Sequence, residues 1–182
     1  MVAMRPARLG SALTALLAGL AVVLGACGGD DGEKSAGNDI TRPEYVAKVG
    51  GYCKTATTQS KPIFARLQKL VDASGTYKSR LIKAAPDLRK LYKIQNTKLT
   101  RFKALEPPTA DRAQIAELTK VAQKVIDEFR EFLPAADNGD LEKFIDIATD
   151  ASGSRADAER LGTNYGLRED CFSLPVDLSN IS

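Results

Sequence analysis

Apolar residues recur at intervals of three and four along most of the chain after residue 40, and no window alternates apolar and polar residues. Such spacing places the apolar side chains on one face of an α-helix. The pattern predicts four helices, separated by proline, glycine and capping residues. They cover Thr41 to about Asp72, the segment after Ser74-Gly75 as far as Leu105, Thr109 to Leu133, and Leu141 to about Tyr165.

Particular residues mark the ends of these helices. Thr41-Arg42-Pro43-Glu44 is a capping box with proline in the first turn, so a helix begins there. Pro62 predicts either a kink or a break with Ser60 as a new cap. The other predicted boundaries are the stop at Pro107-Pro108, Thr109 as a cap, the end at Leu133-Pro134, and Asp140 as a cap within the turn Asp137-Asn138-Gly139-Asp140.

Four helices with short connections predict an all-α fold, an antiparallel up-down-up-down bundle over residues 41–182. The third helix has the most regular apolar stripe, made of Ile115, Leu118, Ala122, Val125, Phe129 and Phe132. In the fourth helix, small side chains stand where bulky apolar ones would be expected, at Ala148, Ala151, Ala156, Ala158 and Gly162. These small residues predict either close helix packing or a groove for an apolar ligand, which Tyr52, Tyr92 and Tyr165 would line.

The first 27 residues follow a different pattern. Arg5 and Arg8 precede an apolar run from Leu9 to Leu24 that has the length of a secretory signal. Leu24-Gly25-Ala26-Cys27, at the end of this run, resembles the lipobox of bacterial lipoproteins. The resemblance implies that residues 1–26 are a cleaved signal peptide and that lipid on Cys27 holds the protein on the outer, extracytoplasmic face of the cell membrane. The alternative is an uncleaved membrane anchor with a chance cysteine.

Residues 27–40 are predicted to be the lipidated cysteine and a flexible linker. Residues 28–40 contain four glycines, four acidic residues and no large apolar residue before Ile40, so they cannot support a core. Thirteen residues of this kind span about 20 Å root-mean-square. The sequence therefore divides into a signal peptide, a linker and one helical domain.

Cys53 and Cys171 are the two cysteines that remain once Cys27 is assigned to lipid. An oxidising compartment favours a disulfide between them, and closing so long a loop stabilises a fold by about 4–5 kcal/mol. The alternative is a pair of free thiols, although neither cysteine has a CxxC partner or a histidine to activate it.

The mature part also resembles small helical lipoproteins of high-GC Gram-positive bacteria. The motifs that carry the resemblance are an early Tyr45 and Cys53, a central Pro107-Pro108, and Tyr165-Gly166-Leu167 followed by Cys171. It implies the fold and the location and lends no activity.

Candidate chemistry is sparse. The chain has no histidine, which removes the commonest general base and metal ligand. It also has no P-loop, GxGxxG or SxxK motif, and its acid pairs fall on polar helix faces. We therefore expect no enzyme, no cofactor and no metal site. The alternative of a different class is an envelope enzyme that uses carboxylates alone.

Charge is distributed unevenly. Fifteen basic and four acidic residues between Arg42 and Glu106 give +11, whereas eight basic and fifteen acidic residues from Thr109 to Ser182 give −7. The functional interpretation is a basic face that docks lipid headgroups, another anionic envelope component or an acidic protein, with nucleic acid excluded by location. This face is centred on Lys83, Arg89, Lys90, Lys93, Arg101 and Lys103. The alternative is that the two oppositely charged hairpins simply attract one another.

From these patterns we expect a membrane-anchored extracytoplasmic lipoprotein whose bundle is a non-catalytic binding or interaction module. A carrier of a small apolar ligand, held in a groove of the bundle, is the alternative.

Overall fold

The computed structural model describes residues 39–168 and 171–172, and all regular structure within them is helical. This confirms the predicted all-α four-helix bundle. The helices are α1 (Arg42–Val71), α2 (Tyr77–Ala104), α3 (Arg112–Asn138) and α4 (Leu141–Tyr165), with a 3₁₀ turn, η1 (Thr109–Asp111), before α3. The predicted signal peptide, the lipobox and nearly all of the linker lie outside the described residues. Among the described helices, none is long and apolar enough to cross a membrane.

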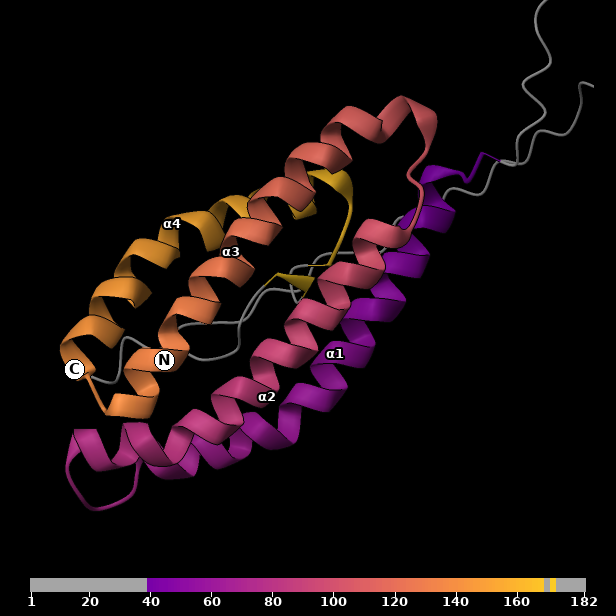
Figure 1. Ribbon diagram of the computed structural model, residues 1–182. Coiled ribbons are helices and arrows are strands. Elements are labelled where there is room, and N and C mark those ends of the chain that lie inside the picture. Colours follow the sequence, from indigo (N-terminus) through magenta and orange to yellow (C-terminus); the bar gives the residue numbers. More distant parts are fainter. Residues whose placement is uncertain (1–38, 169–170, 173–182) are drawn as a thin grey trace, which may run out of the picture. The chain divides into compact units, whose positions relative to one another are not determined.

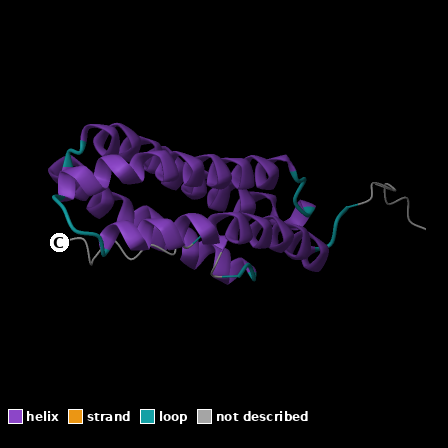
Figure 2. Cartoon of the chain, turned by 90° about the horizontal axis from the view of Figure 1, so that it is seen from below, coloured by secondary structure: helices purple, strands orange, loops and turns teal. Residues whose placement is uncertain are grey.

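Consecutive helices pack against one another along the bundle, whereas α1 and α4 barely touch. Side-chain contacts fix the direction of each pair: Arg66 late in α1 binds Asp87 early in α2, and Tyr165 at the end of α4 binds Asp111 at the start of α3. Figure 1 shows the four helices side by side with alternating direction, and Figure 2 shows their axes roughly parallel from a second side. The α1–α4 side of the bundle is instead bridged by the segment after α4, through the disulfide between Cys53 and Cys171.

Local sequence explains where most helices begin and end. The capping box at Thr41 forms as predicted, with Thr41 N–H donating to the Glu44 carboxylate at 2.9 Å. Asp140 caps α4 by accepting from the Lys143 N–H at 3.1 Å. Gly139 and Gly166 end α3 and α4 in the left-handed conformation, which costs glycine little.

Neither a break at Pro62 nor a helix end at Pro134 occurs. α1 runs continuously through Pro62, and Ser60 is a buried residue of the helix interior instead of a cap. α3 runs through Pro134 to Asn138, because the following Ala135 and Ala136 are buried in the core. A proline removes one helical hydrogen bond, and here packing on both sides of it keeps the helix intact.

The predicted start of the third helix also needs correction. Thr109 does not cap α3; it begins η1, and its N–H donates to the Asp39 carboxylate at 3.2 Å. Asp111 occupies the N-cap position without making a cap bond. Its carboxylate is instead bound by side chains from α1 and α4.

The core has two clusters. The first lies around the disulfide, toward the end of the bundle where α1 begins, and it contains Tyr45, Val49, Leu118, Ile126 and Tyr165 among others. The second lies toward the other end and is rich in phenylalanine, with Phe129, Phe132 and Phe144. In the α3 stripe Ile126 is buried, whereas the predicted Val125 is only half-buried.

Candidate functional site

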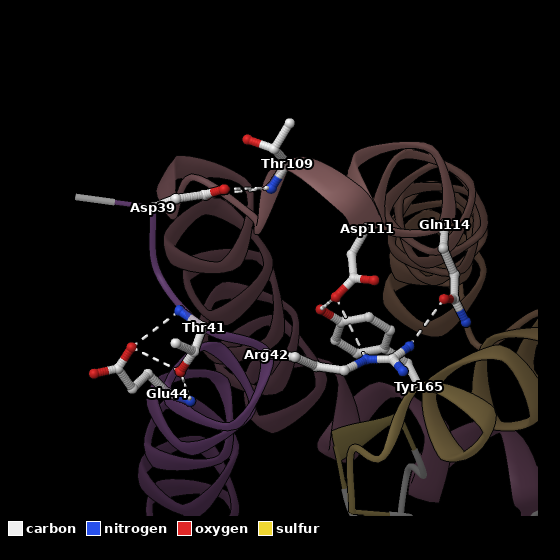
Figure 3. Close-up of polar contacts among 8 residues, drawn as sticks. All are labelled: Asp39, Thr41, Arg42, Glu44, Thr109, Asp111, Gln114 and Tyr165. Carbon is white, nitrogen blue, oxygen red and sulfur yellow. Dashed lines mark hydrogen bonds and ion pairs between the residues drawn. The ribbon is translucent and has the colours of Figure 1, made fainter. Parts of the chain in front are cut away.

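A polar cluster joins three segments at the end of the bundle where α1 begins. The Tyr165 hydroxyl donates to Asp111 Oδ2 at 2.7 Å, and Arg42 Nε lies 3.4 Å from the same oxygen. The Arg42 guanidinium also donates to Gln114 Oε1 at 3.0 Å and stacks over the Tyr165 ring, 4.3 Å from its centroid. Figure 3 shows Arg42 reaching across from α1 to this group.

Burial dominates the electrostatics of this cluster. Burial of Tyr165, followed by its hydrogen bond to Asp111, raises the pKa of its phenol to about 12. Burial likewise raises the pKa of Tyr45, whose ring lies edge-on to Tyr165 at 6.0 Å between centroids. Both phenols are therefore neutral in the physiological range. The cluster therefore links α1, the start of α3 and the end of α4.

The disulfide Cys53–Cys171 is present, and both cysteines are buried. It ties the middle of α1 to the segment that follows α4, as the sequence predicted for an oxidising compartment. Lys98 of α2 donates to the Cys171 carbonyl oxygen. The Phe172 ring lies on α4 at Gly162, where a Cβ would fall 2.2 Å from the ring. In Figure 1 the yellow segment that contains Cys171 lies between the α1–α2 pair and the α3–α4 pair.

Two small cavities lie inside the bundle and share Val125 and Phe129 as lining residues. Their volumes are about 40 Å³ and 60 Å³. Sites for small organic ligands usually measure about 300–1,000 Å³. The described cavities therefore hold a few atoms at most and fall well short of a carrier site.

The small residues of α4 have divided roles. Ala148, Ala151 and Ala158 line the cavities, Gly162 lies beneath Phe172, and Ala156 is exposed. Of the three tyrosines predicted for a groove, Tyr52 lines the smaller cavity, Tyr92 packs edge-on against Phe129, and Tyr165 is committed to Asp111. Because the cavities that these residues line are small, close packing explains the small residues of α4 better than a ligand groove does.

An open furrow of about 480 Å³ runs between α3 and α4. Two of its four acids have partners among the described residues: Asp127 binds Arg130 and Gln123, and Glu128 Oε1 accepts from the Ser154 hydroxyl at 2.8 Å. Glu128 Oε2 is buried without a hydrogen-bond partner in the described structure. The side chain of Glu128 is only 16% exposed, so it is more buried than its place on a predicted polar face suggested. No group of three or more acids or cysteines able to hold a metal occurs among the described residues.

The six basic residues predicted as a face of α2 fall into two sets. Arg89 and Lys103 border α3, where they bind Asp137 and Gln123. The other four, which we name the α2 strip, are exposed: Lys83, Lys90, Lys93 and Arg101. Lys90 shares Asp87 with Arg66, whereas Lys83, Lys93 and Arg101 make no ion pair with any described residue.

Most of the opposite charge on the two hairpins is not neutralised between them. Within the described part of the chain, Arg42–Asp111 and Arg89–Asp137 are the ion pairs that join a cation of the basic hairpin to an acid of α3, α4 or η1. Ion pairs between described residues of the two hairpins thus use two of the fifteen cations between Arg42 and Glu106.

Comparison with protein-family models, curated proteins and solved structures finds no match to this chain. Its own residues must therefore carry any functional argument. Sequence reasoning found the disulfide and the α2 strip. It missed the cluster of Arg42, Asp111 and Tyr165, because these residues lie 69 and 54 positions apart and no local motif connects them.

Proposed function

We propose that this protein is a lipoprotein anchored through Cys27 to the outer face of the cell membrane. Its helical domain acts there as a non-catalytic module that binds an anionic partner through the α2 strip. The observation that carries the binding role is the exposure of this strip, three of whose four cations make no ion pair in the described part of the chain.

Two features support the location. The first is the lipobox-like Leu24-Gly25-Ala26-Cys27 in the sequence. The second is the buried Cys53–Cys171 disulfide, because such bonds persist in exported proteins and are rare in the cytosol. The two features are independent, since one concerns the leader and the other the folded domain.

The state of the carboxylates supports a non-catalytic role. An enzyme that relies on carboxylates needs a convergent acid pair in an enclosed cleft. The α3–α4 furrow is open to solvent, and two of its four acids, Asp127 and Glu128, are bound by lysine, arginine, glutamine and serine side chains. The small volume of the two interior cavities weighs in the same way against the carrier alternative.

Intact-mass spectrometry of protein extracted from membranes tests the location. We expect a chain that begins at Cys27, carries the mass of a diacylglycerol and is two hydrogens lighter than the reduced chain. Cys27→Ser should remove the lipid and leave the disulfide. A chain that begins at Met1, or one without lipid, would contradict the anchor.

A pair of variants with matched charge tests the binding role. The strip variant combines Lys83→Gln, Lys90→Gln, Lys93→Gln and Arg101→Gln. The control variant combines Lys120→Gln, Lys124→Gln, Lys143→Gln and Arg160→Gln, so it loses the same charge from α3 and α4. The strip variant should elute from a phosphate-bearing column at lower salt than the control. Equal elution would mean that net charge alone decides binding.

A further inference from the structure

The α2 strip has the geometry of a surface that contacts an extended anionic plane. Lys83, Lys90 and Arg101 are separated by 7 and 11 residues, close to whole turns of a helix, so they lie on one side of α2. Lys93 lies one turn from Lys90. From Lys83 to Arg101 the helix rises about 27 Å, so the strip is long. A compact ligand would touch only part of it.

Neighbouring charges leave the strip strongly positive. Asp87 is the single acid of α2, and both Arg66 and Lys90 bind it, at 2.8 Å and 3.3 Å. Arg66 also extends the positive surface onto α1, where Lys69 follows one turn later and is exposed. The acidic residues of α3 and α4 give the other hairpin the opposite sign. A molecule with this asymmetry turns its basic hairpin toward an anionic surface.

The predicted anchor supplies such a surface at close range. The predicted linker of thirteen residues spans about 20 Å root-mean-square, so the domain stays close to the lipid on Cys27. Tethering of this kind raises the effective concentration of the second contact to about the millimolar range. Each basic residue near an anionic leaflet strengthens its attraction about fivefold, so four residues that bind weakly one by one suffice together.

We propose that the α2 strip docks the domain on the anionic phospholipid headgroups of the membrane that carries its own lipid anchor. This inference rests on the proposed lipidation of Cys27. In this docked state the bundle lies along the membrane with α2 against the headgroups, and the acidic α3–α4 hairpin faces away from the bilayer.

Lysine acetylation of the mature, lipidated protein in vesicles tests the inference one residue at a time. Vesicles that contain phosphatidylglycerol are compared with vesicles of phosphatidylcholine alone, and peptide mass spectrometry gives the rate at each lysine. We expect Lys83, Lys90 and Lys93 to react at least threefold more slowly in the anionic vesicles. Lys120 and Lys143, exposed on α3 and α4, should react equally in both. Salt at 1 M, where the screening length is about 3 Å, should abolish the protection.

Variants extend the same measurement. With Lys83→Gln, Lys90→Gln and Arg101→Gln combined, Lys93 should lose its protection. With the matched set Lys120→Gln, Lys124→Gln and Lys143→Gln, Lys93 should keep it. Helical circular dichroism of both variants checks that the fold is retained.

The outcomes separate the docking from the anchor. Equal rates in the two vesicle types, with lipid present on Cys27 by intact mass, would overturn the docking and leave the anchor standing. Protection in isolated cell envelopes but not in vesicles would also overturn it, in favour of a wall polymer or an acidic protein. A mature chain without lipid would overturn the proposed anchor and the docking together.

Discussion

The two hairpins of the bundle share one core and differ in charge. α1 and α2 with their connections carry +11, whereas the chain from Thr109 onward carries −7. If this difference served to hold the bundle together, ion pairs would line the interface between the hairpins. The described interface contains two such pairs, hydrogen bonds such as those from Arg42 to Gln114 and from Lys103 to Gln123, and two clusters of apolar side chains. The charge difference is therefore available for a partner.

What holds the hairpins together is concentrated at the end of the bundle where α1 begins. The disulfide and the Arg42–Asp111–Tyr165 cluster both bridge α1 to the end of the α3–α4 hairpin there, across the side where α1 and α4 barely touch. The other end depends on packing of Phe129, Phe132 and Phe144. This contrast predicts a ranking of mutational effects.

The largest effect is expected from loss of the disulfide. Replacing both cysteines, Cys53→Ala with Cys171→Ala, should lower the free energy of unfolding by about 4 kcal/mol, because a loop of 118 residues regains its freedom in the unfolded chain. Urea unfolding of the variant and of the wild type with dithiothreitol should agree. A loss below about 1 kcal/mol would show that the hairpins do not need the link.

A smaller loss is expected at the polar cluster. Tyr165→Phe removes the hydrogen bond to Asp111 and should cost about 1.5 kcal/mol, as is usual for a bond to a charged group. Tyr77→Phe is the matched control, because Tyr77 is 46% exposed and should change nothing measurable. If the two changes lowered the free energy of urea unfolding equally, the hydrogen bond between Tyr165 and Asp111 would not stabilise the fold.

The cluster also predicts a response to alkali. The pKa of Tyr165 is raised to about 12, above the value near 10 expected of an unfolded chain. The neutral phenol is therefore favoured by folding. Its contribution is complete below pH 10 and is lost as the pH rises toward 12. The stability difference between the wild type and Tyr165→Phe should shrink over that range, and a constant difference would contradict the assignment.

A still smaller effect is expected from the ion pair between the hairpins at Arg89 and Asp137. Both side chains are partly exposed, at 47% and 35%. A double-mutant cycle of Arg89→Ala and Asp137→Ala should give a coupling energy below about 1 kcal/mol. A coupling above about 2 kcal/mol would mean that charge does hold the hairpins together.

Local signals explain how much of this structure could be predicted. The capping box at Thr41 and the cap at Asp140 act within a few residues, and both form as predicted. The break considered at Pro62 and the helix end predicted at Pro134 do not occur, because a proline costs a helix one local hydrogen bond that distant packing offsets. The pairing of Cys53 with Cys171 was predictable because two thiols remained after the lipobox was assigned.

The candidate site was predictable only in part. Helical spacing identified six cations on α2, but only the fold shows that Arg89 and Lys103 turn to α3 and that the α2 strip remains exposed. The partners of Asp111 come from α1 and α4, so no window of sequence around it contains them.

The free energy of unfolding of the strip variant tests the central claim, that the basic charge of α2 is available for a partner and does not hold the fold. Exposed residues contribute little, even where they share in a surface ion pair as Lys90 does, so the account predicts a change within about 0.5 kcal/mol of the wild type, similar to the control variant. A loss above about 2 kcal/mol in the strip variant alone would contradict it, because the strip would then be part of what holds the two hairpins together.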